Sequence, residues 1–226
     1  MIGTLINVVA ILAGTALGLL LRKGIPDRLR ETVMQGLGLC VLLIGASGAL
    51  KTADTMCVIV SIVIGGLAGS AVNIERRLDD LGKFAERKLG GAGGFSNAFV
   101  TASLVYCVGA MAIVGAMDSG LRGDHTTLIA KSALDGVSAI FFTSAMGAGV
   151  ALSAAAVLVY QGAIALLATW IAPLLTDPII NEMSAVGGLL IIGIGLNMIY
   201  DKHISVGNLL PAIFVPMAYI PIMNMF

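Results

Sequence analysis

Charged residues are scarce in this chain of 226 residues: Asp, Glu, Lys and Arg make up 12%, against 58% hydrophobic residues. The formal net charge is zero, so the sequence indicates no nucleic-acid partner. Three cysteines occur without a CxxC pair, which favours small packing residues over a disulfide framework or a metal site. HExxH, P-loop and nucleophile-elbow motifs are also lacking. The sequence therefore argues against an enzyme and predicts neither a metal nor a cofactor.

Long apolar runs dominate instead, and the mean hydropathy is +1.00. A helix needs roughly 20 apolar residues to cross a hydrocarbon core ~30 Å thick. The runs lack the alternation of polar and apolar residues that marks transmembrane strands. We therefore predict an all-α membrane protein, one polytopic domain over 1–226. About eight transmembrane helices are expected, at 2–21, 31–50, 55–74, 97–117, 132–147, 149–172, 180–200 and 204–224.

The segment 132–172 is expected to hold two helices, of which the first, the fifth of the chain, is short or broken. Gly147-Ala148-Gly149 interrupts the apolar run, and glycine weakens a helix. A re-entrant element is the alternative, because irregular backbone is tolerated at membrane depth where protein or a water-filled cavity surrounds it.

The distribution of basic residues predicts the orientation in the membrane. With the N-terminus outside, the inner loops hold ten of the 13 basic residues: Arg22, Lys23, Arg28, Arg30, Arg76, Arg77, Lys83, Arg87, Lys88 and Lys202. The outer loops hold the other three, which are Lys51, Arg122 and Lys131. Because Lys and Arg accumulate in cytoplasmic loops, this bias favours eight spans with both termini outside.

The longest polar stretch, 75–94, separates the third and fourth apolar runs. Hydrophobic residues recur within it at helical spacing among charges: Leu78, Leu81, Phe84, Ala85 and Leu89. This pattern is typical of an amphipathic helix lying on the membrane surface, here the cytoplasmic one. A plain solvated connector is the alternative.

Two ordered series of residues indicate an internal repeat. They are Gly14-Thr15-Ala16-Leu17, Pro26, Glu31, Gly36 and Gly45, and then Gly162-Ala163-Ile164-Ala165, Pro178, Glu182, Gly187 and Gly195. The steps from Glu31 to Gly36 and from Glu182 to Gly187 are equal, whereas the rest needs short gaps. With eight spans, the first three and the last three helices run in opposite directions, which is the inverted repeat of many secondary transporters. Similar composition of glycine-rich helices is the alternative explanation.

Several longer motifs resemble one family of bacterial membrane proteins. They are Gly3-Thr4-Leu5-Ile6-Asn7, Phe99-Val100-Thr101-Ala102-Ser103-Leu104, the stretch 107–115, Gly123-Asp124-His125-Thr126-Thr127, Leu134-Asp135-Gly136, Tyr160-Gln161-Gly162, the stretch 180–188 and Asn208-Leu209-Leu210-Pro211-Ala212. The motifs occur in the same order as in the domain-of-unknown-function 554 family, and the chain is similar to that family over nearly its whole length. The resemblance implies a multi-pass protein of the bacterial inner membrane, and it carries over neither a substrate nor a catalytic residue.

One departure from that family concerns the end of the third helix. Similar proteins often have an acidic residue there, where this chain has Gly69-Ser70-Ala71. An essential charge is therefore not expected at this position.

Three carboxylates are the candidates for transport or coupling: Asp135, Glu182 and Glu31. Asp135 is expected to open the fifth helix, and because a carboxylate in hydrocarbon costs ~2.5–3.5 kcal/mol on insertion scales, it must face a polar cavity or a partner. An ion- or proton-coupling role competes with a structural one, in which Asp135 at the helix N-terminus pairs with Lys131. Glu182 either lines a polar stripe with Asn197 or caps a packed helix. Glu31 is its counterpart in the repeat, at the opposite membrane face.

Polar side chains within the spans are candidates for a polar pathway: Asn7, Gln161, Asn197, Ser138 and Asn208. Structural hydrogen bonding between helices is the alternative, since such bonds form in lipid but average only ~0.6 kcal/mol. Four glycines are expected to allow close packing of helices, within the chain or between copies: Gly3, Gly14, Gly18 and Gly193.

Together these features predict a small secondary transporter or channel-like permease for an unknown small solute or ion. Its polar path would lie between the first, fifth, sixth and seventh helices. The alternative is a non-transporting membrane scaffold or sensor, which would act on protein partners through 75–94 and the glycine stripes. The lipid bilayer is a partner in both cases, and a homo-oligomer is compatible with both.

Overall fold

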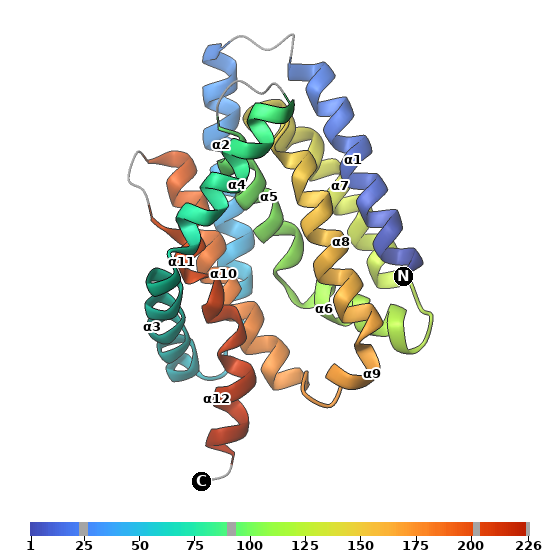
Figure 1. Ribbon diagram of the computed structural model, residues 1–226, viewed down its shortest axis with the longest axis vertical. Helices are drawn as coiled ribbons and strands as arrows, with labels where there is room; N and C mark the ends of the chain where they lie inside the picture. Colours follow the sequence, from blue (N-terminus) through green and yellow to red (C-terminus); the bar gives the residue numbers. More distant parts are fainter. Residues whose placement is uncertain (23–26, 90–93, 201–203, 225–226) are drawn as a thin grey trace.

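All regular structure is helical in the part of the chain that the structure, a computed structural model, describes: residues 1–22, 27–89, 94–200 and 204–224. The elements are α1 (Ile2–Arg22), α2 (Asp27–Ala49), α3 (Thr55–Val72), α4 (Ile74–Leu89), α5 (Phe95–Cys107), α6 (Ala110–Leu121), α7 (Thr126–Met146), α8 (Val150–Leu166), α9 (Ala168–Ile171), α10 (Asp177–Ile199), α11 (Val206–Leu209), the 3-10 helix η1 (Leu210–Phe214) and α12 (Pro216–Met223) (Figure 1). The predicted all-α class is confirmed. Lys23, Pro26, Lys202 and residues 90–93 lie outside the described residues.

Six helical segments of the described chain are long and apolar enough to cross a membrane. They are Ile2–Arg22, Glu31–Ala49, Thr55–Val72, Thr126–Met146, Asp177–Ile199 and Val206–Met223. A seventh results if α5 and α6, which meet at a bend of 61°, form one span. The apolar helix α8 has 17 residues and is shorter than these. The chain is therefore a multi-pass membrane protein, with six or seven spans by length where the sequence predicts about eight.

The flanking side chains set the ends of α3. Asp54 Oδ1 accepts hydrogen bonds from the N–H groups of Met56 (2.9 Å) and Cys57 (3.2 Å), which satisfies two of the donors that a helix start leaves open. The helix ends where Asn73 takes the left-handed conformation, with φ 56°, which asparagine tolerates better than most residues. This reversal allows the charged helix α4 to follow α3 directly.

The break in a membrane helix lies between α5 and α6 and not in the fifth predicted helix. α7 is continuous over 21 residues, and Gly147 (φ 96°) ends it before α8, so 132–172 holds most of α7, then α8 and the four-residue helix α9. The interruption falls at Val108 and Gly109, inside the predicted span 97–117. Gly109 has φ 128° and ψ 152°, a conformation open essentially only to glycine. The prediction of a short or broken fifth helix is wrong, because the glycines at 147 and 149 form a turn between two helices.

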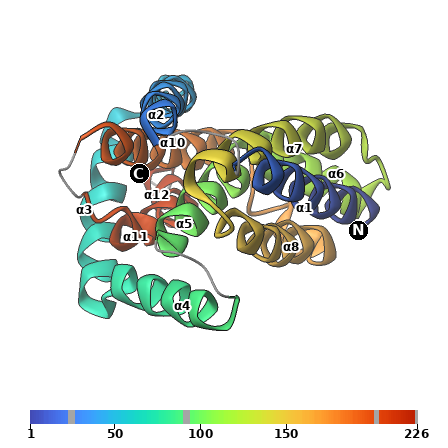
Figure 2. The same ribbon diagram turned by 90° about the horizontal axis from the view of Figure 1, so that it is seen from above.

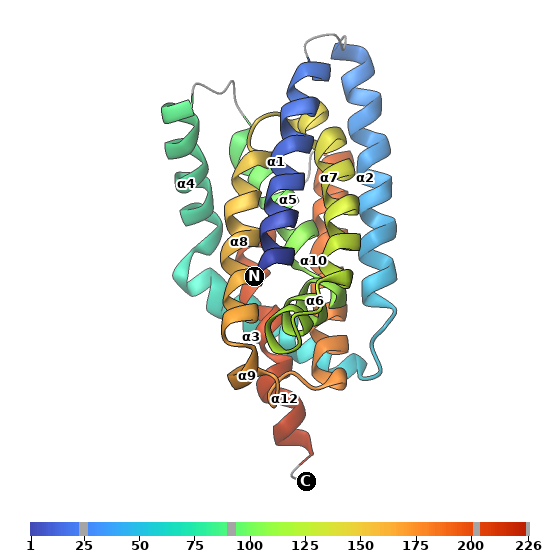
Figure 3. The same cartoon turned by 90° about the vertical axis from the view of Figure 1, so that its right-hand side faces the viewer.

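Glycines bring α1 into backbone contact with α7. A Cβ atom at Gly14 would overlap the carbonyl oxygen of Gly136, and one at Gly18 would lie 2.6 Å from the carbonyl oxygen of Ile140. Gly3 faces Leu128 near the other end of the same contact, so the two helices run parallel along their whole length (Figure 3). Small residues replace side-chain packing here, as they do at many membrane helix interfaces.

The second close pair, α2 and α10, runs antiparallel. A Cβ atom at Gly45 would lie 2.7 Å from the carbonyl oxygen of Gly188, and one at Gly195 would lie 3.0 Å from that of Gly38. Viewed from above, α2 with α10 and α1 with α7 form two neighbouring pairs, and α5 lies between α10 and α8 (Figure 2). The fourth predicted packing glycine, Gly193, faces Val206 of α11 instead of a helix backbone.

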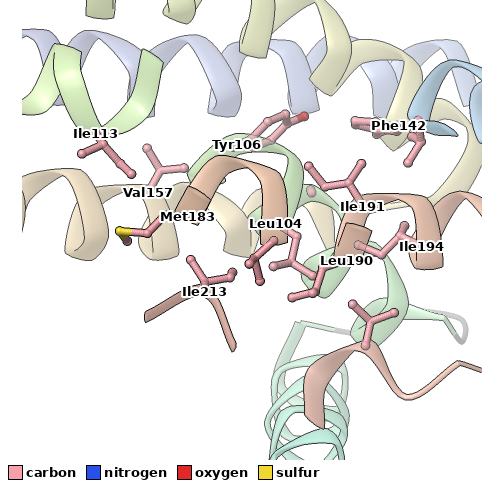
Figure 4. Packing of buried hydrophobic residues seen from close by; sticks show 14 of the residues in the cluster. Leu104, Tyr106, Ile113, Phe142, Val157, Met183, Leu190, Ile191, Ile194 and Ile213 are labelled. Atoms are coloured by element: carbon pink, nitrogen blue, oxygen red, sulfur yellow. The ribbon is translucent and has the colours of Figure 1, made fainter. Parts of the chain in front are cut away.

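The apolar core lies where α5, α7, α8 and α10 meet. Figure 4 shows Leu104, Leu190, Ile191 and Ile194 gathered where α5 packs against α10, and these side chains are at most 4% exposed. Large hydrophobic side chains also cover the outside of the bundle. Because a continuous apolar outer surface is stable only in lipid, the fold implies a surrounding bilayer.

The α1–α7 contact predicts that Gly14→Ala destabilises the fold. The added methyl group has no room against the backbone of α7, and overpacking of this kind typically costs about 1–3 kcal/mol. The matched control is Gly36→Ala in α2, where nothing lies within 4 Å of the added atom. Thermal unfolding of the detergent-solubilised protein should show a lower midpoint for Gly14→Ala alone. Equal midpoints for the two variants would contradict the described packing.

Candidate functional site

A buried ion pair lies within α7. Lys131 Nζ donates hydrogen bonds to both carboxylate oxygens of Asp135, at 2.8 and 2.7 Å, and the two side chains are 8% and 7% exposed. The residues are four apart, so they share one face of the helix. Moving either charge out of water costs several kcal/mol, which close pairing and further hydrogen bonds must offset. The pairing that the sequence offered as the structural alternative for Asp135 is thus present.

Two amides from other helices complete this cluster. Asn7 Nδ2 of α1 donates to Asp135 Oδ2 (2.9 Å) and lies 3.4 Å from Gln161 Oε1 of α8, its second acceptor. Asn7 and Gln161 are fully buried, and among the described residues Asn7 Oδ1 and Gln161 Nε2 have no hydrogen-bond partner. The structure therefore brings three of the predicted site residues together with Lys131, and it leaves spare polar atoms beside them.

Asp135 does not open its helix. α7 begins at Thr126, nine residues earlier, so Asp135 lies in the third turn, where the backbone N–H groups are already paired. The predicted start at residue 132 is six residues too late, because the polar side chains of Thr126, Thr127 and Lys131 are typical of a loop. The carboxylate is consequently stabilised by Lys131 and Asn7 and not by a helix N-terminus.

The ion pair faces a cavity of about 600 Å³ between α2, α5, α6, α7 and α10, here called the Asp135 cavity. Lys131, Asp135 and Ser138 line it from α7, and Lys51 lines it from the end of α2. Ser138, a predicted pathway residue, donates from Oγ to the backbone oxygen of Asp135 at 3.0 Å. It therefore lies at the wall of the cavity. Most of the remaining lining is apolar.

The α5–α6 break forms another wall of the Asp135 cavity. Val108 and Gly109 line it, so the last turn of α5 and the first turn of α6 meet there. The Val108 N–H donates to the Leu104 oxygen (2.9 Å), which closes the last turn of α5. The Ala112 N–H donates to the Gly109 oxygen (3.1 Å), which closes the first turn of α6. The hydrogen-bond pattern of a continuous helix is interrupted between these two bonds. Interrupted helices are a common construction of substrate and ion sites in transporters.

Tyr106 lies next to this break, and the sequence offered no reason to select it. Its side chain is fully buried, its ring centroid is 6.2 Å from that of Phe142, and its hydroxyl group interacts with the side chain of Ser138. Electrostatic interaction couples Tyr106, and also Cys107, to Asp135. A tyrosine in an apolar run resembles an ordinary core residue, and only the three-dimensional structure shows that it borders the cluster.

Glu182 lies apart from the Asp135 cluster. Its carboxylate is buried near the start of α10 and accepts hydrogen bonds from the Thr52 hydroxyl (2.7 Å) and from the N–H groups of Ala53 (2.7 Å) and Asp54 (3.2 Å). These groups belong to the loop between α2 and α3, so Glu182 fixes that loop. Glu31, its predicted counterpart, is exposed near the opposite end of α2.

Asn197 and Asn208 connect helices near the other end of the bundle. Asn197 Nδ2 donates to the Ile204 oxygen and its Oδ1 accepts from the Ile204 N–H, both at 2.8 Å. Asn208 Oδ1 accepts from the Glu75 N–H (2.9 Å), and Glu75 Oε2 accepts from the Gly207 N–H (2.6 Å), which joins α4 to α11. Neither amide reaches the cluster around Asp135.

A second cavity, here called the Asn197 cavity, has a volume of about 220 Å³ and lies between α5, α7, α10 and α11. Its polar lining comes from Glu75, Asn97, Thr101 and Asn197. A groove of about 660 Å³ beneath α4 continues it and shares Glu75 and Asn97. The sequence reasoning missed Glu75 and Asn97 because both lie at helix ends, where polar residues are common.

Side chains of the loop before α7 cap the start of that helix. Asp124 Oδ1 accepts a hydrogen bond from the Thr126 N–H (2.9 Å), which lowers the pKa of this carboxyl below its usual range. His125 Nδ1 lies 2.9 Å from Ser119 Oγ. Within the described residues, no three His, Cys, Asp or Glu side chains come together as metal ligands.

Comparison with known proteins identifies relatives across nearly the whole chain. The model of a family described as "Protein of unknown function (DUF554)" matches residues 2–221. The uncharacterized membrane protein YdfK of Bacillus subtilis is 34% identical, over 100% of this chain and 98% of its own length. The uncharacterized protein YqgA of Escherichia coli is 33% identical, over 96% and 94%. No solved structure matches. The family resemblance read from the sequence motifs is confirmed.

The buried pair predicts that a second substitution restores part of the stability lost by the first. Asp135→Leu leaves Lys131 as an uncompensated buried cation, and removing one partner of such a pair typically costs about 3–5 kcal/mol. Adding Lys131→Met removes the unpaired cation, so the double variant should be more stable than Asp135→Leu. Thermal unfolding midpoints of the three proteins check this. A double variant no more stable than the single one would show that the two charges are not coupled.

The contacts of Glu182 predict a local structural effect. Glu182→Ala leaves two N–H groups and one hydroxyl group of the α2–α3 loop without their acceptor, at a cost of about 1–3 kcal/mol. Amide hydrogen exchange at Ala53 and Asp54 should become faster. Glu31→Ala, at an exposed position, should leave stability within about 0.5 kcal/mol. Unchanged exchange in Glu182→Ala would contradict the anchoring of this loop.

Proposed function

This chain belongs to the DUF554 family, and we propose that it is a secondary transporter or channel-like permease for a small solute or ion in the bacterial inner membrane. One observation carries the proposal. The buried Lys131–Asp135 pair faces a cavity of about 600 Å³ beside an interrupted helix. Charges within a membrane are costly and mark ion or substrate pathways. A purely structural ion pair would need neither the cavity nor the two amide atoms beside it that lack a partner within the described residues, Asn7 Oδ1 and Gln161 Nε2.

The two cavities support a path across the protein. On α7, Asp135, Ser138 and Phe142 line the Asp135 cavity, and Ala145 and Met146 line the Asn197 cavity. These positions follow one another at helical spacing, so one face of α7 serves both cavities. The same holds for α10, where 184, 188 and 191 line the first cavity and 194, 197 and 198 the second.

Between the cavities the path is closed by apolar side chains. Leu104, Phe142, Ile191 and Ile194 are each 3–4% exposed and lie where α5, α7 and α10 meet (Figure 4). A closed state of this kind is what alternating access requires, since the site opens to one side at a time. In the proposed mechanism Asp135 is the coupling acid, and Asn7, Gln161 and Ser138 are the polar groups beside it. Asn197 serves the second cavity.

The packing of the predicted repeat also supports a transporter. Its counterpart helices are α1 with α8, α2 with α10, and α3 with α11 and η1, and each of these pairs is in contact. The α2–α10 contact is nearly symmetric, because Gly45 faces Gly188 and Gly38 faces Gly195. Contacts of this kind are expected about a two-fold axis in the membrane plane. Counting α5–α6 and α8, the chain then crosses the membrane eight times, with both termini outside.

The alternative is a membrane scaffold or sensor that acts through the amphipathic helix α4. Its exposed face carries the Lys83–Asp79 ion pair, at 2.5 Å, and Phe84 is 53% exposed. A surface of this kind fits a protein partner or a lipid headgroup region. This alternative leaves the buried Lys131–Asp135 pair unexplained, so transport is the better account.

Flux into liposomes tests the transport proposal. Purified protein is reconstituted with a pH-sensitive dye inside, and sodium, potassium, short carboxylates, alkyl sulfonates and neutral amino acids are added one at a time outside. At least one solute should move protons faster than in protein-free liposomes, and Asp135→Asn should slow this flux at least tenfold. Gly36→Ala, which lies away from both cavities, should retain it.

Two results would contradict the proposal in different ways. If Asp135→Asn and Glu182→Gln transport as fast as the unmodified protein, neither acid has a coupling role. If no solute moves and affinity capture yields a stoichiometric protein partner, the scaffold or sensor is the correct function.

A further inference from the structure

We propose that the Asp135 cavity binds an amphiphilic monoanion, meaning an apolar chain with one carboxylate, sulfonate or phosphate group, which enters sideways from the bilayer. This inference names the solute of the transporter proposed above and in that respect rests on it. It is carried by three properties of the cavity: its opening, its lining and its charge.

The opening of the cavity faces lipid. Leu43 and Ile44 of α2 and Leu134 of α7 line it and are also 69%, 47% and 62% exposed. All three lie on transmembrane segments, and exposed apolar side chains on such segments contact acyl chains. The gap between α2 and α7 is therefore open to the hydrocarbon region, and a hydrophilic solute would not approach through it.

The lining suits a ligand with an apolar body. Val105, Val108, Met111 and Phe142 form apolar walls, and the charged groups are Lys131 and Asp135 of α7 and Lys51. Three serine hydroxyl groups complete the polar lining, those of Ser47, Ser138 and Ser184. Small-molecule sites are typically ~300–1,000 Å³ in volume and mostly apolar, with a few polar groups that fix orientation. At about 600 Å³ the Asp135 cavity falls within this range.

The charge of the lining selects an anion. Lys131 and Asp135 neutralise each other, so Lys51 leaves the wall with one net positive charge. Glu182 and Asp54 accept hydrogen bonds at the α2–α3 loop and at the start of α3, and neither residue lines the cavity. The first turn of α6 also lines the cavity, and a helix N-terminus carries partial positive charge.

The ion pair gives the anion a means of coupling to protons. A bound anionic group can replace Asp135 as the partner of Lys131, and Asp135 then takes up one proton from solution. One anion and one proton enter together, so the net charge of the site is unchanged. Besides Lys131, the ionisable groups that share the cavity or interact with Asp135 are Lys51 in the turn after α2 and Tyr106 and Cys107 of α5. α1 and α8 contribute the neutral amides of Asn7 and Gln161.

Calorimetric titration in phosphatidylcholine nanodiscs tests the ligand class, with empty nanodiscs as the reference. The probe is octanesulfonate, which stays charged at all pH values used. Methanesulfonate has the same headgroup without the chain, and octyltrimethylammonium has the same chain with the opposite charge. Octanesulfonate should bind saturably, and at least tenfold more tightly than either analogue. Equal binding of either analogue, or no saturable binding above empty nanodiscs, would overturn the proposal.

Substitutions locate the site. Leu43→Trp should fill the opening and weaken octanesulfonate binding at least tenfold, whereas Leu39→Trp, on the same helix at 62% exposure and outside the cavity, should not. Lys51→Gln should weaken binding several-fold. If Leu43→Trp and Leu39→Trp bind equally, the probe occupies another site, and the assignment to this cavity is wrong.

The pH dependence tests the exchange at Lys131. Binding to the unmodified protein should tighten as pH falls, because protonation of Asp135 frees Lys131 for the sulfonate. Asp135→Asn mimics the protonated acid, so it should bind at least as tightly and lose this pH dependence. Octanesulfonate should also raise the unfolding midpoint of this variant. A variant that still shows the pH dependence would refute the exchange.

Binding and flux separate this inference from the proposed function. Saturable octanesulfonate binding without flux of any solute would support the ligand class and contradict transport. Flux of sodium, potassium or an amino acid without octanesulfonate binding would support transport and contradict the ligand class.

Discussion

The structure around α7 depends on keeping two opposite charges together away from water. Neither Lys131 nor Asp135 would be stable alone in its position, so their mutual hydrogen bonds are a condition of the fold. The glycine contacts of α1 serve the same end, because only a close approach of α1 to α7 allows Asn7 to reach the carboxylate. The same cluster that constrains the fold also borders the Asp135 cavity, so packing and the proposed function depend on one helix.

Much of this arrangement was predictable because lipid restricts what a chain can do. Apolar runs must become helices, so most segments were placed within a few residues. The glycines at 3, 14 and 18 recur on one helix face, and such a stripe is typical of close packing between membrane helices. Asp135 stood out because an acid within an apolar run is rare, and Asn7 and Gln161 because amides there need partners. Lys131 was visible as the residue one turn earlier.

Other features depend on contacts that no local pattern reveals. Glu182 and Asn197 lie on one stripe of α10, yet each bonds to the backbone of a different loop, at 52–54 and at Ile204. The sequence cannot show where those loops fold back. The break at Val108 and Gly109 was misplaced for a related reason: glycine is frequent throughout these helices, and only the conformation of Gly109 distinguishes an interruption from a packing contact.

The backbone contact between α1 and α7 limits how this protein can change shape. Helices that touch through glycines along their length cannot slide or tilt independently without losing that contact, so α1 and α7 form one rigid piece. α2 and α10 form a second for the same reason. The two pieces meet along a weaker seam between α2 and α7, which is where the Asp135 cavity lies. A rocking movement along this seam would widen or shut the cavity while leaving the hydrogen bonds of Asp135 to Lys131 and Asn7 intact.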